Sequence, residues 1–180
     1  MAGLKVICPG VQMKVSGSLL TQAGRVYVGV IGAGECTPPE ASLAEEVGRE
    51  VARRGGVVLC GGRRGVMEAA AKGAQQAGGL VVGILPGTDR REGNPYLTVA
   101  LATGLGDARN AVIACASDVL IAVAGGYGTL SEIGFALKMG RPVVGLFTWE
   151  LSRAGRPFAV HRAESAREAV DLAFKLAAKA

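Results

Sequence analysis

The chain has 180 residues and a mass of 18.3 kDa, enough for one domain with a single hydrophobic core. Apolar residues make up 49% of the chain and charged residues 19%, which excludes a disordered protein. Only 4% are aromatic, which argues against a stacking platform for single-stranded nucleic acid. The net charge of +5 fits a pocket for anions as well as it fits nucleic acid.

The first half of the chain alternates apolar runs with helical patterns. Residues 1–24 are predicted to be an N-terminal extension with a small hairpin and a linker, and residues 25–180 are predicted to be the domain. After the extension, the pattern predicts a strand, a helix, a strand, a helix and a strand. These elements are expected, in that order, at residues 25–31, 40–54, 57–60, 66–77 and 80–85.

The second half begins with a polar segment, residues 86–95, which is predicted to be a loop. A short strand or turn is expected at residues 96–103, and Asp107 is expected to cap the helix that follows. The remaining pattern predicts a helix, a strand, a helix, a strand and a helix. Their expected positions are residues 108–117, 118–123, 129–139, 142–147 and 163–178.

Strands that alternate with helices pair in parallel through crossover connections. The expected strands are almost entirely apolar, which is typical of a sheet covered by helices on both faces. The sequence therefore predicts an open, doubly wound α/β fold with a mainly parallel sheet in one domain. No second domain and no internal repeat is expected.

Histidine and cysteine are too sparse for most of the chemistry that they support. His161 is the single histidine, which rules out a site with several His ligands, and it is expected at the surface. The cysteines are scattered without a CxxC spacing, so neither a metal site nor a disulfide framework is expected. Free thiols predict a reducing cytoplasm, and neither a signal peptide nor a membrane span is expected. Cys36 and Cys60 are interpreted as small buried thiols outside the site.

Three predicted strands lead into glycine-rich loops that open helices. The carboxyl ends of parallel strands meet at one edge of a sheet, so these loops should share one rim. Glycine lets the backbone approach an anion closely, and a helix start offers unpaired N–H groups. A tight turn alone would explain one such loop, but three on one rim predict a site for phosphate or another anion. The candidate binding residues are Gly32, Gly34, Gly61, Gly62, Arg63, Arg64, Gly125, Gly126, Tyr127, Gly128 and Thr129.

Arginine outnumbers lysine 14 to 6, and it clusters in loops. The pairs Arg63–Arg64 and Arg90–Arg91 follow adjacent predicted strands, and guanidinium groups bind phosphate oxygens in pairs. A solvated surface pair is an equally good interpretation of Arg90–Arg91. The pair Arg53–Arg54 closes a helix, where cations complement the helix dipole, and is interpreted as structural.

Incomplete motifs narrow the class of the ligand. Gly32 and Gly34 form only half of a dinucleotide fingerprint, because Thr37 stands in place of the third glycine. No acidic residue follows the second strand to bind a ribose, which argues against NAD as the ligand. The pair Arg63–Arg64 could bind a 2′-phosphate, so NADP stays a possible ligand. The chain has no GxxxxGK[ST] motif, which argues against ATP hydrolysis by a P-loop.

Glu132 has two interpretations. Thr129 and Glu132 have the spacing of a capping box, which is the better reading of the spacing alone. Arg109, however, lies in the first turn of a predicted helix, where a cation opposes the dipole and indicates a partner, either Glu132 or an anion. If they converge, one acid beside one cation could stabilise an oxocarbenium-like centre, with Asp107 and Glu35 as candidates for a second carboxylate.

Three motifs in order resemble those of the LONELY GUY (LOG) family, whose members often carry a lysine decarboxylase label. The run AGGYGTLSE, residues 124–132, resembles the PGGxGTxxE motif, and GGRRGVM, residues 61–67, resembles the GGGxxGLM loop. Arg109 stands where the family has its catalytic arginine. The resemblance covers roughly residues 26–147. It implies a Rossmann-like fold, a homo-oligomer (dimer or tetramer), and a nucleoside-monophosphate site with Arg109 and Glu132 catalytic.

The chain departs from the family motif at three positions. Ala124 replaces Pro, Asn110 replaces Lys, and Glu68 follows Met67 where the family has Gly. The combination GDARN…AGGYGTLSEI is more similar to relatives known as molybdenum-cofactor carrier proteins. Lysine decarboxylation is not expected, because a pyridoxal enzyme needs a positioned lysine and no rim loop contains one.

The preferred hypothesis is a cytoplasmic homo-oligomer that binds a phosphorylated small molecule, either a nucleoside monophosphate or a pterin phosphate such as molybdenum cofactor. No cofactor is required, and molybdenum cofactor would be a carried ligand. The first alternative is a phosphoribohydrolase that cleaves the N-glycosidic bond of nucleoside 5′-monophosphates, including N6-substituted ones, as LOG enzymes do. The second is a DNA-binding protein of the DNA-processing Rossmann type, which the lack of long basic runs disfavours.

Overall fold

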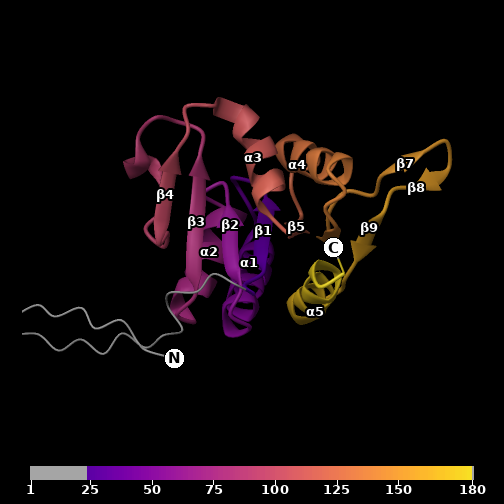
Figure 1. Ribbon diagram of the computed structural model, residues 1–180, viewed down its shortest axis with the longest axis horizontal. Coiled ribbons are helices and arrows are strands. Elements are labelled where there is room, and N and C mark those ends of the chain that lie inside the picture. Colours follow the sequence, from indigo (N-terminus) through magenta and orange to yellow (C-terminus); the bar gives the residue numbers. More distant parts are fainter. Residues whose placement is uncertain (1–23, 180) are drawn as a thin grey trace, which may run out of the picture.

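Seven parallel strands form one sheet in the computed structural model, which describes residues 24–179 (Figure 1). Residues 1–23, which carry most of the predicted extension, lie outside the described residues. The strands of the sheet are β1 (Tyr27–Gly32), β2 (Val57–Cys60), β3 (Leu80–Leu85), β4 (Val99–Ala102), β5 (Val119–Val123), β6 (Val143–Leu146) and β9 (Val160–Arg162).

The order of strands across the sheet is β4-β3-β2-β1-β5-β6-β9. The chain first winds outward from β1 to β4 and then returns to β5, which pairs with β1 on its other side. In an open α/β sheet, ligands bind beyond the carboxyl ends of the strands at such a switch point. The topology therefore places the expected site beyond the ends of β1 and β5.

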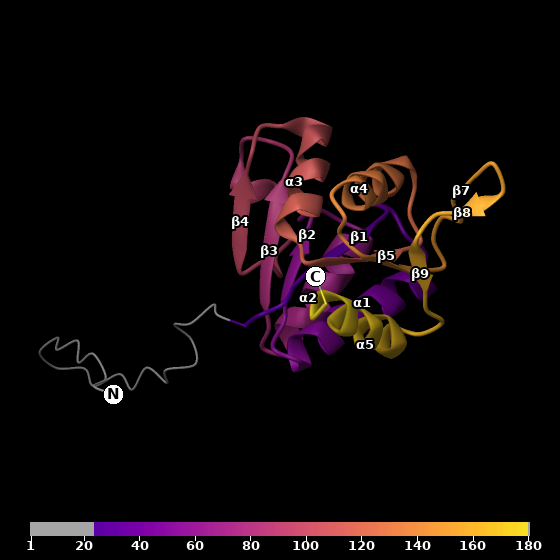
Figure 2. The same cartoon turned by 45° about the vertical axis from the view of Figure 1, so that its right-hand side comes forward.

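Helices cover both faces of the sheet (Figure 2). The first face carries α1, α2 and α5, and the second carries α3 and α4. The helices are α1 (Pro38–Arg53), α2 (Val66–Gln76), α3 (Arg109–Ala116), α4 (Tyr127–Lys138) and α5 (Ala166–Ala177), and two short 3-10 helices are η2 (Arg90–Glu92) and η3 (Gly106–Ala108). The doubly wound, parallel, Rossmann-like α/β fold predicted from the sequence is confirmed.

Alternate side chains of the central strands supply two hydrophobic cores. Val28 and Val30 of β1 are fully buried beneath α1, α2 and α5, whereas Ile31 packs toward α3 and α4. This alternation follows from the period of two along a strand. Burial on both faces explains why the strands read as continuous apolar runs.

Two glycines allow α1 and α2 to pack closely. A Cβ at Gly48 would collide with the carbonyl group of Ala70, and a Cβ at Gly73 would collide with that of Glu45. These contacts require glycine at both positions. They hold α2 against α1, and so fix the start of α2 beside the loop that follows β1.

Three features differ from the sequence-based expectations. Helix α1 begins at Pro38 and not at residue 40. Proline is well suited to the first turn of a helix, because the N–H groups of that turn have no partner within the helix and the missing N–H of proline costs no hydrogen bond. Asp107 does not cap α3, because it lies within η3 and the cap position is Ala108. The third difference is the segment of short strands at 152–162, which no pattern predicted.

This segment follows β6 and lengthens the sheet. Strands β7 (Ser152–Arg153) and β8 (Arg156–Pro157) form a small antiparallel hairpin that projects from the body of the molecule (Figure 1). Strand β9 then pairs with β6 at the edge of the sheet, and His161 within it is exposed, as expected. Strands of two or three residues are too short to show a periodic pattern. Among the described helices, none has the length and apolar character needed to cross a membrane.

Candidate functional site

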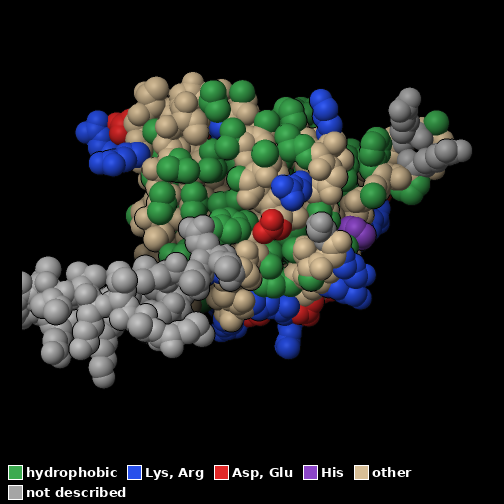
Figure 3. All heavy atoms as spheres, viewed as in Figure 1, with side chains coloured by type: hydrophobic (Ala, Val, Ile, Leu, Met, Phe, Trp, Pro, Cys, Tyr) green, Lys and Arg blue, Asp and Glu red, His purple; other side chains and the backbone are tan. Residues whose placement is uncertain are grey.

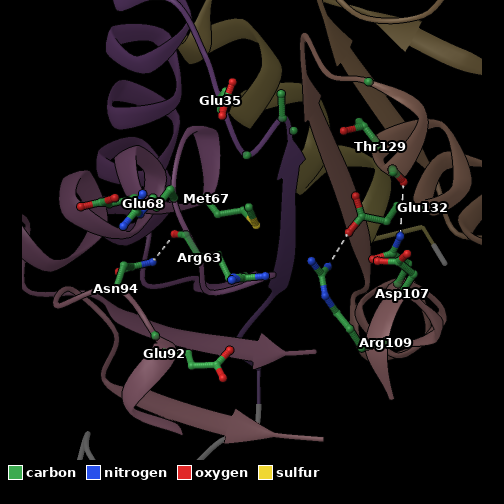
Figure 4. A pocket seen from close by; sticks show the side chains of 18 of the residues that line it. Glu35, Arg63, Met67, Glu68, Glu92, Asn94, Asp107, Arg109, Thr129 and Glu132 are labelled. Atoms are coloured by element: carbon green, nitrogen blue, oxygen red, sulfur yellow. Dashed lines mark hydrogen bonds and ion pairs between the residues drawn. The ribbon is translucent and has the colours of Figure 1, made fainter. Parts of the chain in front are cut away.

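An open pocket of about 980 Å3 lies at the rim where the glycine-rich loops meet (Figure 4). We call it the rim pocket. It is lined from one side by the loops after β1 and β2 and by the start of α2, and from the other by the starts of α3 and α4. Among the predicted site residues, those that line it are Gly32, Gly34, Arg63, Arg64, Arg109, Gly126, Gly128, Thr129 and Glu132.

Four predicted binding residues do not line the rim pocket. Gly61 and Gly62 are buried against neighbouring side chains: a Cβ at Gly61 would stand 2.6 Å from Arg109 Nη2, and a Cβ at Gly62 would stand 2.8 Å from Leu85 Cδ2. Their role is to leave room for packing. Tyr127 is 83% exposed and its ring packs on Trp149, with the ring centroids 5.8 Å apart.

The fourth residue, Gly125, shapes the turn between β5 and α4. Its φ of +107° is closed to most side chains, and a Cβ there would collide with Thr129. Ala124, the preceding residue, has a φ of +47°. Proline is restricted to a φ near −65°, so the proline of the LOG motif could not take this conformation. The departure at position 124 therefore accompanies a distinct backbone turn.

The start of α4 presents unpaired backbone N–H groups to the rim pocket. Gly126 is the N-cap, and the first backbone hydrogen bond of the helix runs from Leu130 N to Gly126 O, at 3.0 Å. The N–H groups of residues 127–129 precede that bond and so have no partner within the helix. Gly126 and Gly128 leave the backbone open at this point, since a Cβ at either would meet no atom within 4 Å. This is the geometry of an anion site at a helix N-terminus.

Arg63 enters the rim pocket from the side opposite α4 (Figure 4). Its backbone is fixed by Asn94, whose Nδ2 donates to Arg63 O at 2.9 Å. Both Arg63 and Arg64 are exposed and line the rim pocket. Arg91 lines it as well, but it also forms an exposed ion pair with Asp89 at 2.7 Å.

Arg109 and Glu132 converge, and the predicted capping box at Thr129 does not form. Helix α4 begins at Tyr127, so Thr129 and Glu132 lie inside the helix and cannot cap it. Instead, Arg109 Nη1 donates to Glu132 Oε1 at 3.1 Å (Figure 4). The side chains are only 12% and 7% exposed. The Arg109 cation at the start of α3 thus has the carboxylate partner that its position indicated.

Burial controls the charge of this pair. Desolvation raises the pKa of Glu132 to about 7, although the Arg109 guanidinium acts in the opposite direction. Glu132 can therefore gain or lose a proton near neutral pH, as a general acid or base must. Arg109 Nε is a buried donor without a partner among the described residues.

The two cysteines near the rim lie outside the rim pocket, but only Cys60 is buried as expected, because Cys36 is partly exposed. Cys60 is fully buried at the end of β2, and this burial raises the pKa of its thiol to about 11. Burial also raises the pKa of the Cys36 thiol, with the charge of Glu40 adding to the effect. Both groups are protonated at neutral pH, which makes them poor nucleophiles.

Carboxylates also surround the rim pocket. Glu35 and Asp107, which were considered as rim carboxylates, both line it. Glu68 and Glu92 line it too and were not predicted. The positions of Glu68 and Glu92 depend on how the loops at the rim pack against one another, and no local sequence pattern predicts this packing.

Asn110 and Ser131 were also missed by the sequence analysis. Asn110 is 6% exposed and lines the rim pocket, and its Nδ2 donates to Ser131 Oγ at 2.8 Å. Ser131 Oγ in turn donates to Gly128 O at 2.7 Å. The bond between residues 110 and 131 lies next to the ion pair between residues 109 and 132, so two adjacent links join the starts of α3 and α4. The departure from lysine at position 110 was the one available signal.

Comparison with known proteins places the chain among close relatives. A family model described as the SLOG cluster4 family matches residues 25–171. A protein of uncharacterised function from Archaeoglobus fulgidus is 50% identical over 123 residues, which are 67% of this chain and 80% of the relative. The structure of the molybdenum cofactor binding protein from Rippkaea orientalis superposes with a TM-score of 0.78 and 37% identity, covering 84% of this chain and 97% of that one.

Two further relatives bear on the alternatives. The cytokinin riboside 5′-monophosphate phosphoribohydrolase LOG5 of Arabidopsis thaliana is 39% identical over 103 residues. The match covers 55% of this chain but only 43% of the plant enzyme. DNA processing protein A from Helicobacter pylori, at 18% identity and a TM-score of 0.62, shares the fold alone.

Proposed function

The chain belongs to the SLOG cluster4 family, a LOG-like family near the molybdenum-cofactor carrier proteins, and from this premise we propose that it binds a phosphorylated small molecule in the rim pocket. The ligand is a nucleoside monophosphate or a pterin phosphate such as molybdenum cofactor. One observation carries the proposal: the free N–H groups that start α4 face the same pocket as Arg63, Arg64 and Arg109.

Charge and shape both support a phosphate at the start of α4. The N-terminus of a helix favours an anion through its dipole and its N–H groups, and a phosphate oxygen accepts those bonds. Guanidinium groups on the opposite wall supply further donors in paired geometry. The volume of about 980 Å3 is ample for a ring system beside the phosphate.

We place binding and carriage ahead of hydrolysis. The molybdenum cofactor binding protein from Rippkaea orientalis is matched over 97% of its length. The plant hydrolase, in contrast, is matched over less than half of its length. Hydrolysis is the second candidate because of one observation: the buried Arg109–Glu132 pair, in which the pKa of Glu132 is about 7, suits an acid that assists a leaving base.

Incubation with AMP, an N6-substituted AMP and a phosphorylated pterin separates these candidates. For a carrier, we expect saturable binding without release of free base, and the same result for Glu132→Gln. Calorimetry measures the binding, and chromatography measures the base. Release of base by the wild-type protein but not by Glu132→Gln would contradict carriage and establish the hydrolase. Failure of all three compounds to bind would refute the proposal.

We extend the proposal to self-association. Strand β4 lies at the edge of the sheet, and Val99, Leu101 and Leu105 on or beside it are each 45–50% exposed. Hydrophobic side chains are visible across this side of the molecule (Figure 3). Buried contact with another copy would remove this apolar surface from water.

Light scattering should therefore report a mass of two or four chains, and a monomer at micromolar concentration would contradict this part of the proposal. The cytoplasmic location remains a prediction.

A further inference from the structure

Asn110 lies beside the Arg109–Glu132 pair, and its amide has a defined orientation. Ser131 Oγ carries one hydrogen, and it donates that hydrogen to Gly128 O at 2.7 Å. Toward Asn110 it can therefore act only as an acceptor, so the group that faces it at 2.8 Å must be Nδ2. Nδ2 also lies 3.5 Å from Gly128 O, which is an acceptor as well. Both neighbours require the same orientation.

The carbonyl oxygen of the Asn110 amide, Oδ1, has no hydrogen-bond partner among the described residues. The side chain is nevertheless more than nine-tenths buried and lines the rim pocket. Unlike Arg109 Nε, Oδ1 is not among the fully enclosed atoms that lack a partner, so this atom keeps some accessible surface on a residue that lines the rim pocket. A buried acceptor left without a donor costs stability, which a ligand donor would restore.

Resting on the function proposed above, we infer that Asn110 is a specificity-determining residue whose Oδ1 accepts a hydrogen bond from a hydroxyl group of the ligand. A phosphate oxygen has no hydrogen to offer and would be repelled by Oδ1, so this position does not take the phosphate. A hydroxyl can donate to Asn110 and accept from Arg109, whose guanidinium uses one of its five N–H groups on Glu132. The ligand class is therefore a sugar-phosphate type with a hydroxyl at this position.

The sequence context strengthens this assignment. The LOG motif has lysine at this position, and an ammonium group is a donor that attracts anionic oxygen. Asparagine removes the charge and presents an acceptor to the rim pocket instead. The substitution thus separates two functions along the rim: the start of α4 and Arg63 receive the phosphate, whereas Asn110 and Arg109 receive a neutral hydroxyl.

The test compares AMP with 2′,3′-dideoxy-AMP, which lacks both ribose hydroxyls. Calorimetry measures both affinities for the full-length wild-type protein and for Asn110→Ala and Ser131→Ala. We expect the wild-type protein to prefer AMP by more than about fivefold, because the hydroxyl forms one bond with Asn110 and another with Arg109. Asn110→Ala should reduce this preference by about fivefold, the value of one neutral hydrogen bond, and bind 2′,3′-dideoxy-AMP as the wild type does. Ser131→Ala is the matched control: it breaks the same bond between α3 and α4 but leaves Oδ1, so it should retain the preference.

Each other outcome has a definite meaning. If Asn110→Ala retains the full preference, or if Ser131→Ala reduces it equally, the inference is overturned and Asn110 is only structural. If Asn110→Ala weakens both compounds equally, the donor is a base N–H and the hydroxyl assignment is wrong. Inorganic phosphate is titrated in parallel. Wild-type protein that binds phosphate but shows no preference refutes the inference alone. Wild-type protein that binds neither phosphate nor AMP overturns the inference, and it refutes the proposed function as well if the N6-substituted AMP and the phosphorylated pterin also fail to bind.

Discussion

Replacing Arg109 with methionine is expected to lower the free energy of unfolding by about 3 kcal/mol at pH 8, because it leaves the Glu132 carboxylate buried without its cation. Both side chains are almost fully enclosed, at 12% and 7% exposure, so water cannot replace the lost partner. At pH 5.5 the loss should be smaller, since Glu132, with a pKa of about 7, is then protonated and needs no cation. Urea unfolding at the two pH values measures the difference.

The wild-type protein should show the pH dependence of Glu132 itself. Its pKa rises from 4.5 to about 7 on folding, so the folded protein holds a proton that the unfolded chain has lost between these values. The carboxyl group therefore favours the folded state below pH 4.5, and about 3 kcal/mol of that contribution is lost as the pH rises through about 7. Glu132→Gln should flatten the curve across this interval.

Arg91→Met is the control for Arg109→Met. The ion pair of Arg91 with Asp89 is exposed, with 87% of the Arg91 side chain accessible, and such pairs contribute little. We expect no measurable change in the free energy of unfolding at either pH. Equal effects of the two substitutions, or an Arg109→Met effect that does not change with pH, would show that the Arg109–Glu132 pair is not the buried, titrating unit described above.

Gly128→Val should abolish most of the ligand binding without harming the fold. A Cβ at Gly128 meets no atom within 4 Å, so the protein can accommodate a side chain there. Because Gly128 lines the rim pocket, that side chain occupies the space before the free N–H groups of α4. We expect AMP and phosphate to bind at least tenfold more weakly, a loss of about 1.4 kcal/mol or more. Calorimetry measures the affinity, and thermal unfolding measures the stability.

Gly134→Val is the matched control on the same helix. A Cβ at Gly134 also meets no atom within 4 Å, and the residue is exposed but does not line the rim pocket. Both substitutions replace a helical glycine, so both should leave the melting temperature unchanged or raise it. Wild-type affinity in Gly128→Val would exclude the start of α4 as the anion site. Equal weakening in both variants would mean that the effect is not local to the rim pocket.

The sequence was sufficient for the fold because its signals are local and repeated. Long apolar runs and helical periods marked β1, β5 and α5, and parallel topology then brought the glycine-rich loops to one edge. The convergence of Gly32, Arg63 and Gly128 on one pocket follows from that topology alone. Separate sequence segments could thus be assigned to one site before their distances were known.

The remaining parts of the site depend on tertiary contacts that have no local signature. The spacing of Thr129 and Glu132 matches a capping box, but the turn at Gly125 makes α4 begin earlier, at Tyr127. Glu132 therefore lies inside the helix and pairs with Arg109 instead. The bond between Asn110 and Ser131 depends on how α3 packs against α4. The glycine-rich loop that contains Gly61 has the composition of a phosphate-binding loop, yet the role of Gly61 itself is to leave room for the Arg109 side chain.

A crystal structure of the protein grown with AMP tests the central claim most directly. We expect the phosphate to lie at the start of α4, with its oxygens within hydrogen-bond distance of the N–H groups of residues 127–129 and of at least one of Arg63 and Arg64. A phosphate bound anywhere else on the molecule, or an apolar part of the ligand seated against those N–H groups, would contradict the account.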